Sequence, residues 1–218
     1  MKQSSFLSIV GPNGSGKTMF SANLGLAFTR LGYDVLIVDN NQFPALGFHF
    51  NMPFPTRTIQ KTLKENKPLK EALYKHPSGL KLILSSPLEK PETINFDLLE
   101  GLAQIIIIDG QKFKHNIVLL NPNMPSVMDA VKNHIDINTA GIVLNKINSI
   151  NMTEESVIVL ANRENLMTIE SEKSQKDALK EGMPLFDLDS DTKISADFLK
   201  LASKLVGKEY EILIEHHG

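Results

Sequence analysis

Eight consecutive residues near the N-terminus have the types and the spacing of a loop that binds phosphate. Residues 11–18 read GPNGSGKT and match the pattern G-x-x-x-x-G-K-[ST] at every fixed position. Glycines allow the backbone to curl until successive N–H groups point at one phosphate, and Lys17 adds a positive charge. The Thr18 hydroxyl suits Mg²⁺, which prefers oxygen ligands. We expect nucleotide phosphates to bind at Gly11, Pro12, Asn13, Gly14, Ser15, Gly16, Lys17, Thr18 and Met19.

Two aspartates follow apolar runs that are typical of buried strands. Asp109 comes after residues 105–108, which are all isoleucine, and Asp39 comes after residues 35–38. An acid at the end of such a strand holds Mg²⁺ through water in many phosphate-loop proteins. The alternative for Asp109 is an aspartate that caps a turn, but the phosphate loop favours the metal role. The expected magnesium ligands, direct or through water, are Thr18, Asp39 and Asp109.

The elements around the loop are those that a phosphate site requires. Residues 6–10 form a short apolar run typical of a buried strand, and residues 17–31 carry apolar side chains at helical spacing. Gly32 follows this helix in the position of a helix-ending glycine. A second apolar strand is expected within residues 34–39. The chain therefore begins with strand, loop, helix and strand, which is the crossover unit of a parallel sheet.

The remainder continues this alternation. Further strands are expected at residues 80–84, 105–108, 117–120, 140–144 and 166–169. Helical stretches are expected at residues 58–63, 68–74, 96–102, 126–133 and 194–206, while residues 153–165 fit either a helix or a strand. The fold class is therefore α/β, a doubly wound, mostly parallel sheet with helices on both faces. No linker or repeat divides it, so one nucleotide-binding domain spans residues 1–218.

Composition excludes several classes of protein. The 218 residues carry a formal net charge of -2, less basic than expected for a protein that wraps nucleic acid through bulk charge. The absence of cysteine excludes disulfides, zinc ribbons, thiolate-held iron–sulfur clusters and cysteine nucleophiles. No apolar run approaches the roughly 20 residues that cross a bilayer. No secretory signal begins the sequence, so we expect a cytoplasmic protein.

Two families share the loop pattern but not the rest of the chain. ABC transporter ATPases have an LSGGQ-type helix start and an Asp-Glu pair after the acidic strand, whereas Asp109 precedes Gly110 and Gln111. Small-molecule kinases usually clamp phosphates with several arginines. Only three arginines occur in this sequence, and they are widely separated. Neither family therefore fits.

The chain resembles the MinD/ParA family of P-loop ATPases from the loop nearly to the C-terminus, through a series of short segments in the same order. Beyond the loop, the similar segments are residues 32–39, 46–47, 58–63, 68–72, 79–86, 106–110, 120–130, 141–146 and 178–185. Each segment is weak alone, but together their order and intervals are specific. The resemblance implies ATP or ADP and Mg²⁺ as ligands, an ATP-dependent homodimer, Asn145 as an adenine contact, and Lys17, Asp39 and Asn41 as catalytic residues.

Two departures from the family pattern affect the expected mechanism. Pro12 stands where the family has a second lysine that reaches the partner's phosphates, and Asn41 stands where it has an aspartate that positions the attacking water. Asparagine can hydrogen-bond a water but cannot accept its proton. Because phosphoryl transfer depends on positioning and charge neutralisation, we expect tight Mg-ATP binding with slow hydrolysis. Lys112 is a conjectural substitute for the missing lysine. The alternative is a non-hydrolysing, ATP-bound adaptor or scaffold in a larger assembly.

The sequence gives weaker signals about partners. The tail at residues 208–218 has no basic face, so direct membrane binding is not expected. Lysines 61, 64, 67, 70 and 75 suggest DNA, but a solvated helix face with interleaved glutamates is the better reading. A protein partner is expected but unidentified, and an apolar loop beside the site would suit it: Phe43, Phe48, Phe50, Met52 and Phe54. All six histidines are interpreted as surface or structural residues.

Overall fold

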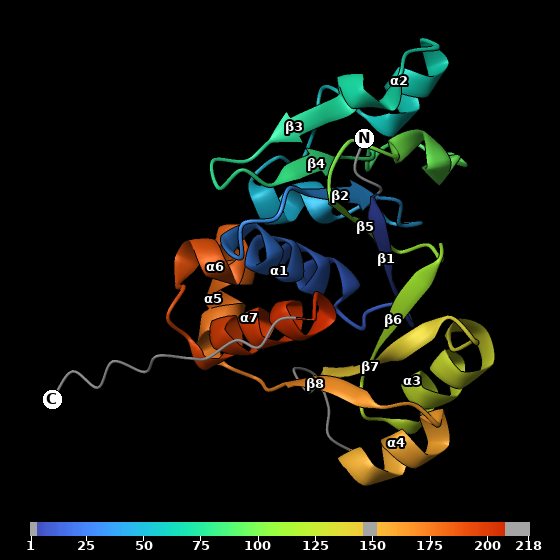
Figure 1. Ribbon diagram of the computed structural model, residues 1–218, viewed down its shortest axis with the longest axis vertical. Coiled ribbons are helices and arrows are strands. Elements are labelled where there is room, and N and C mark those ends of the chain that lie inside the picture. Colours follow the sequence, from blue (N-terminus) through green and yellow to red (C-terminus); the bar gives the residue numbers. More distant parts are fainter. Residues whose placement is uncertain (1–3, 146–151, 208–218) are drawn as a thin grey trace, which may run out of the picture.

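The computed structural model describes residues 4–145 and 152–207 of the chain. These residues build one eight-stranded sheet in the order β3-β4-β2-β5-β1-β6-β7-β8 (Figure 1). Its strands are β1 Ser5–Val10, β2 Val35–Asp39, β3 Leu73–Lys75, β4 Lys81–Ile83, β5 Ile105–Asp109, β6 His115–Leu120, β7 Thr139–Asn145 and β8 Asn165–Ile169. All neighbouring strands are parallel except β3 and β4. The expected mostly parallel α/β sheet is confirmed.

The strand order reverses at β1. The chain adds β2, β3, β4 and β5 on one side of β1 and then crosses to add β6, β7 and β8 on the other side. In open α/β sheets, ligands bind outside the carboxyl ends of the strands at such a reversal. The phosphate loop directly follows β1, so the fold puts it at this position.

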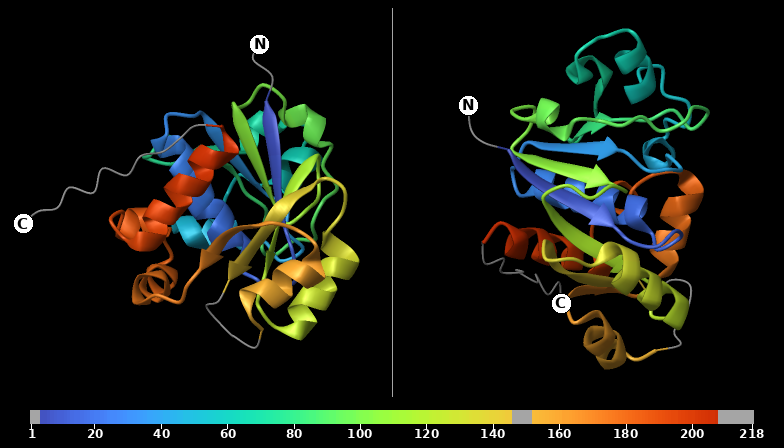
Figure 2. Two further views of the ribbon diagram at one scale, coloured as in Figure 1. Left: turned by 60° about the horizontal axis from the view of Figure 1, so that its bottom comes forward. Right: turned by 90° about the vertical axis from the view of Figure 1, so that its right-hand side faces the viewer.

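Helices cover both faces of the sheet (Figures 1 and 2). One face packs against α1 Lys17–Arg30 and α7 Lys193–Leu205, which contact one another, with α5 Lys173–Glu181 and α6 Leu185–Leu188 beside them. The other face packs against α2 Ile59–Lys64 and a 3₁₀ turn, Phe96–Leu99, at one end. At its other end lie α3 Met124–Asp129 and α4 Glu154–Ala161.

The apolar strands supply both cores because successive side chains point to opposite faces. Ile107 packs with the α1 and α7 layer, while Ile106 and Ile108 pack with the α2 layer. All three side chains are fully buried. A strand buried on both faces reads as a continuous apolar run, which is why residues 105–108 gave so clear a signal.

The structure differs from the expected elements in the middle of the chain. Only Leu69–Ala72 of the helix expected at 68–74 is helical, as a 3₁₀ turn, because the next residues form β3. There Tyr74 pairs with Leu82 of β4 in an antiparallel ladder. The helix expected at 96–102 ends at Leu99. The helix expected at 126–133 is α3 followed by a π-helical turn, Ala130–His134.

The ambiguous segment at 153–165 contains a helix, α4, and its start is set by Thr153. The Thr153 hydroxyl accepts a hydrogen bond from the backbone N–H of Ser156, which satisfies one free donor of the first turn. Helices α5 and α6 and the 3₁₀ turn Leu46–Phe50 had no expected counterpart from periodicity. Leu46–Phe50 includes residues 46–47, one of the segments that resemble the family.

Candidate functional site

The phosphate loop owes its shape to glycines in backbone conformations that other residues rarely adopt. Gly11, Gly14 and Gly16 have φ angles of 146°, 77° and 93°. A Cβ atom on Gly11 would lie 2.0 Å from the carbonyl oxygen of Leu119 in β6, so no side chain fits there. The loop ends at Gly16, and α1 begins at Lys17 with its N–H groups turned toward the loop. The loop therefore has the curled backbone that the sequence predicted, and phosphate binding stays a prediction.

Lys17 is held over the loop by its own backbone. The Nζ atom donates hydrogen bonds of 3.0 Å to the carbonyl oxygens of Gly11 and Pro12. The side chain is buried, and this burial lowers the pKa of its amino group below the ordinary value, although Asp109 and Asp129 oppose the effect. A desolvated ammonium group that faces an open pocket gains strongly from an arriving anion.

Asn145, the expected adenine contact, braces the loop from the end of β7. Its Nδ2 atom donates a 2.8 Å hydrogen bond to the carbonyl oxygen of Ser15, and its own carbonyl accepts one from Asn121 at 3.0 Å. Asn145 therefore touches the backbone of the phosphate loop, and the adenine role stays a prediction. Lys146, which follows it in the matching segment, lies outside the described residues.

Gly16→Ala is expected to lower both stability and nucleotide affinity. A Cβ there would lie 2.5 Å from Asn145 Nδ2 and would displace the bond to Ser15. The left-handed backbone adds a strain of about 1–2 kcal/mol. Gly32→Ala is the matched control, since Gly32 has φ 85° but no atom within 4 Å of the added carbon. Thermal melts should show a loss in both variants, and calorimetry should show weaker Mg-ATP binding in Gly16→Ala alone. Equal affinities would contradict the bracing role of Asn145.

The two expected metal acids are neighbours at the carboxyl edge of the sheet. Asp39 ends β2 and Asp109 ends β5, and the two residues are direct partners in the parallel ladder. Both are buried, with 1% and 0% of their surface exposed. Asp109 accepts a 3.1 Å hydrogen bond from the Ser21 hydroxyl of α1, and the Thr18 hydroxyl also bonds it. Thr18, Asp39 and Asp109 are therefore brought together, as the sequence predicted.

The electrostatics of this acid pair favour a cation. Burial raises the pKa of both carboxyl groups, and the charge of Asp109 raises the pKa of Asp39 further. Backbone N–H groups act in the opposite direction, among them that of Leu46, which donates to Asp39 at 3.0 Å. Two buried carboxylates side by side repel one another, and a divalent cation beside them reverses this cost.

Asn41 lies between the acids and Thr18. Its Nδ2 atom donates to Asp109 Oδ2 at 2.6 Å and lies 3.4 Å from Thr18 Oγ1. Its side chain also packs on Gly110, where an added Cβ would lie 2.2 Å from Asn41 Oδ1. With φ at 102°, Gly110 is required by its backbone as well as by this contact. The amide of Asn41 therefore links Thr18 and Asp109, two of the residues expected to hold magnesium.

An open pocket of about 670 Å³ lies over these residues. Of the residues expected to bind, it is lined by Gly11, Asn13, Gly14, Gly16, Lys17, Thr18, Met19, Asn41 and Asn145. Pro12 and Ser15 contribute to the loop without lining the pocket, and Asp39 and Asp109 lie buried behind Thr18 and Asn41. The volume is within the range of small-molecule and cofactor sites.

Several residues that line the pocket were missed by the sequence analysis. They are Gln42, Ala45, His49, Gly110, Asp129, His134 and Leu179, while Phe43 belongs to the apolar loop expected beside the site. The two histidines were interpreted as surface or structural, and the structure places both in the wall of the pocket. The only signal for Asp129 was its place in the family-like segment at 120–130. No signal in the sequence indicated His134, because a π-helical turn, not ordinary helical spacing, brings it to the site.

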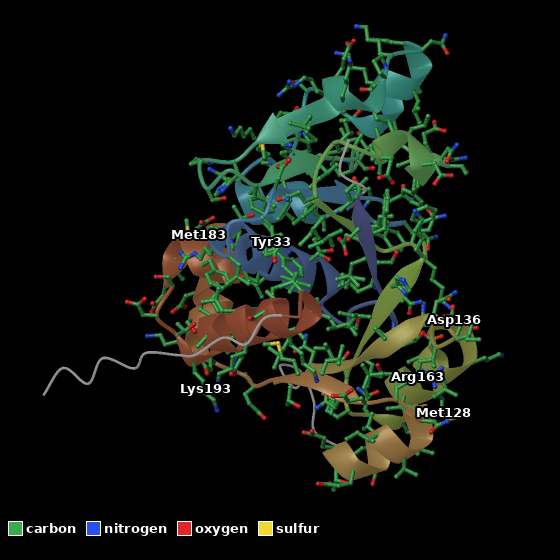
Figure 3. The ribbon with its side chains drawn as sticks, viewed as in Figure 1. Tyr33, Met128, Asp136, Arg163, Met183 and Lys193 are labelled. Atoms are coloured by element: carbon green, nitrogen blue, oxygen red, sulfur yellow. The ribbon has the colours of Figure 1, made fainter. Side chains whose placement is uncertain are left out.

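The lysines singled out in the sequence are engaged elsewhere. Lys112 Nζ pairs with Asp136 at 2.9 Å and does not line the pocket, so the structure gives no support to its substituting for the missing lysine. Figure 3 shows Asp136 on the α3 side of the molecule with Arg163, which donates to the carbonyl of Asp136 at 2.8 Å. In the lysine cluster, Lys64 pairs with Glu89, and Lys67 pairs with Glu65 at 2.8 Å. These ion pairs favour a solvated face over a DNA surface.

The apolar loop beside the site divides into exposed and buried members. Phe43, Phe48 and Phe54 are 71%, 48% and 67% exposed, whereas Phe50 is 7% exposed and packs in the core. Phe50 is therefore not available to a partner. Across residues 4–145 and 152–207, no helix has the length and apolarity that spanning a bilayer requires. The tail at 208–218, with His216 and His217, lies outside the described part of the chain.

Comparison with known proteins gives a family and close folds. Residues 5–148 match the family model described as Cellulose biosynthesis protein BcsQ. Two relatives in Methanocaldococcus jannaschii, the Uncharacterized ATP-binding proteins MJ0169 and MJ0547, are 26% and 25% identical to the chain. The alignments cover 90% and 92% of this chain and 86% and 87% of the relatives.

Solved structures show the same architecture. The septum site-determining protein MinD of Pyrococcus horikoshii, complexed with Mg-ADP, superposes with a TM-score of 0.77 at 20% identity, over 93% of this chain and 96% of that one. The MinC:MinD complex of Aquifex aeolicus gives 0.78 at 20% identity, over 96% and 98% of the two chains. The McdA–ATP complex of Cyanothece gives 0.74 at 14% identity, over 97% and 100%. The chain belongs to the family of the Cellulose biosynthesis protein BcsQ model, and it has the fold of the MinD and ParA ATPases.

Proposed function

We propose that this protein binds Mg-ATP in the pocket, dimerises in its ATP-bound form and hydrolyses ATP slowly, so that it acts as a nucleotide-dependent positional or assembly switch. The observation that carries this proposal is the junction of Thr18, Asn41 and Asp109 beneath the glycine loop. It combines a phosphate cradle with a buried acid pair, Asp39 and Asp109. The Mg-ADP of one structural neighbour and the ATP of another support the choice of ligand.

The residues present fit such a ligand. The loop N–H groups and Lys17 would hold the phosphates, and Thr18 would ligate Mg²⁺, with Asp39 and Asp109 bonding its waters. Bound Mg²⁺ supplies positive charge that stabilises the phosphates as negative charge develops. Asn41 Nδ2 donates to Asp109 Oδ2, so its amide would share this carboxylate with the waters of the ion. Its amide oxygen can orient a water toward the terminal phosphate but cannot remove a proton from it.

A dimer is supported by the apolar rim of the pocket. Phe43 and Leu179 line the pocket, and they are 71% and 48% exposed. Phe48 lies on the same segment, and its carbonyl oxygen lies near Gly182, at the end of α5. Exposed apolar groups gathered around a binding site indicate a surface that another protein covers. A second copy that closes over the nucleotide would bury this rim and exclude water.

A second candidate function is a non-hydrolysing, ATP-bound adaptor. Pro12 and Asn41 favour it, because they remove a cation and a carboxylate from the hydrolytic machinery of the family. Gel filtration with and without ATP, run beside a phosphate-release assay, separates the two. The switch predicts an ATP-dependent dimer that returns to monomer as phosphate appears. The adaptor predicts that the dimer persists without phosphate release, and a lack of ATP binding in calorimetry would reject both.

Phe43→Ser with Phe48→Ser is expected to weaken ATP-dependent dimerisation by at least about tenfold, because each exposed ring buried at an interface contributes about 1–3 kcal/mol. Mg-ATP affinity should change less than about twofold. Ile137→Ser is the matched control, since Ile137 is 93% exposed just before β7, at the opposite edge of the sheet. Analytical ultracentrifugation measures the dimer. Equal loss of dimer and nucleotide affinity would show that these rings act on nucleotide binding and not on the dimer contact.

A further inference from the structure

The pocket wall contains an acid–imidazole pair to which the proposed function assigns no role. Asp129 and His134 both line the pocket, together with Lys17 of the phosphate loop. Their side chains approach one another, with His134 Nε2 3.6 Å from Asp129 Oδ2. The imidazole is partly shielded, with 26% of its side chain exposed. This is an ionisable pair placed at the phosphate side of the site.

The backbone places this pair through an unusual helical turn. Helix α3 ends at Asp129 and continues as a π-helical turn from Ala130 to His134. A π turn has an i→i+5 repeat, so it brings two residues five positions apart onto one face, whereas an α-helix would separate them. The other oxygen of Asp129 accepts a 2.5 Å hydrogen bond from Asn133. Asp129 is thus fixed on both sides, and the imidazole rests against a positioned carboxylate.

Few positive charges are available to a polyphosphate in this pocket. Among the described residues that line it, Lys17, His49 and His134 are the side chains able to carry one. Burial lowers the pKa of His49 to about 4, so that imidazole stays neutral at physiological pH. Burial also lowers the pKa of His134. Asp129 opposes this shift, while Lys17 and Lys112 reinforce it.

We propose that His134 is a phosphate-sensing residue, which rests against Asp129 before nucleotide binds and takes up a proton from solvent to face the phosphates of the bound nucleotide. This inference rests on the proposed function, because it requires a nucleotide in the pocket. A nearby polyanion stabilises the imidazolium form, so binding raises the pKa of His134. The direction of the pH dependence of nucleotide affinity follows from this rise in pKa. Affinity is highest below the pKa of the free protein and falls as the pH rises through the higher pKa of the complex.

The test is calorimetry with Mg²⁺ and AMPPNP, an analogue that is not hydrolysed. Titrations at pH 7 in buffers of different ionisation enthalpy give the number of protons taken up per nucleotide. Titrations at pH 6 and pH 8 give the pH dependence of the dissociation constant. The wild-type protein is expected to take up protons and to bind up to about tenfold more weakly at the higher pH, which corresponds to a pKa shift of about one unit.

His134→Gln is expected to abolish the proton uptake that this residue contributes and to flatten the pH dependence, while binding persists. His115→Gln is the matched control, since His115 is exposed at the start of β6, away from the carboxyl edge, and should behave as wild type. If His134→Gln takes up as many protons as wild type, the inference is wrong and the proposed function stands. If wild-type protein binds no AMPPNP, both are wrong.

Discussion

Asn41→Asp is expected to increase the rate of ATP hydrolysis by about a hundredfold at saturating Mg-ATP. Removing a single positioned group that acts on the transition state typically costs a factor of about 10² to 10³, and restoring one should regain a similar factor. The carboxylate would stand where the Asn41 amide now lies, 2.6 Å from Asp109 Oδ2 and 3.4 Å from Thr18 Oγ1. It would accept a proton from a water that the amide can only orient.

The same substitution should reduce stability in the absence of magnesium. Position 41 donates a hydrogen bond to Asp109, and a carboxylate there would replace this bond by repulsion within a group that already contains Asp39. Burial has already raised the pKa of both existing acids, so a third charge is costly without a cation. We therefore expect a lower melting temperature for Asn41→Asp in EDTA and a larger increase on adding Mg-ATP than wild type shows.

Single-turnover phosphate release measures the rate of hydrolysis by Asn41→Asp, and thermal melts measure its stability with and without magnesium. Asn40→Asp is the matched control, because it adds the same charge one residue earlier, where the side-chain amide of Asn40 donates to Gln111 and not to the Asp109 carboxylate. It should not accelerate hydrolysis. Rapid hydrolysis by wild-type protein that survives Asn41→Ala would contradict the role given to this position. A rate for Asn41→Asp equal to wild type, with unchanged ATP affinity, would contradict it as well.

The parts of the fold that sequence predicted are those with strong local signals. The buried strands were recognised because burial on both faces demands an unbroken apolar run, as in Ile105–Asp109. The phosphate loop was recognised because its three glycines all adopt positive φ, and Gly11 also leaves no room for a side chain. These constraints act over a few neighbouring residues, so they produce a pattern that can be recognised in the amino-acid sequence.

The missed parts depend on contacts between distant residues. Strand β3 has only three residues and exists because β4 pairs with it. Helix α5 has few apolar residues, and only its Gln175 and Ala178 are buried. In the site, the Asn41–Asp109 bond joins residues 68 positions apart. The family resemblance gave Asn41 a role, but no spacing rule could show that its amide would bond one of the metal acids.

Lys17→Ala is expected to weaken Mg-ATP binding at least about a hundredfold while leaving the fold nearly unchanged. The buried ammonium group is the only charge donated by the phosphate loop, and its attraction to a polyphosphate is strong at low local dielectric. In the nucleotide-free protein, the contribution of Lys17 to folding stability is small. The two hydrogen bonds to Gly11 and Pro12 contribute about 1 kcal/mol each. The unfavourable burial of the charge, seen as a lowered pKa, offsets part of this.

Thermal melts separate these two contributions. Without nucleotide, Lys17→Ala should melt within a few degrees of wild type. At a ligand concentration about 100 times the wild-type dissociation constant, Mg-ATP should stabilise wild type by about 2.7 kcal/mol and the variant by less than about 0.5 kcal/mol. Lys61→Ala, which removes an exposed lysine from α2, should keep the full shift. If Lys17→Ala also keeps it, the phosphate loop does not bind the nucleotide. Since Thr18 directly follows Lys17 in that loop, the magnesium site would then lose its basis as well.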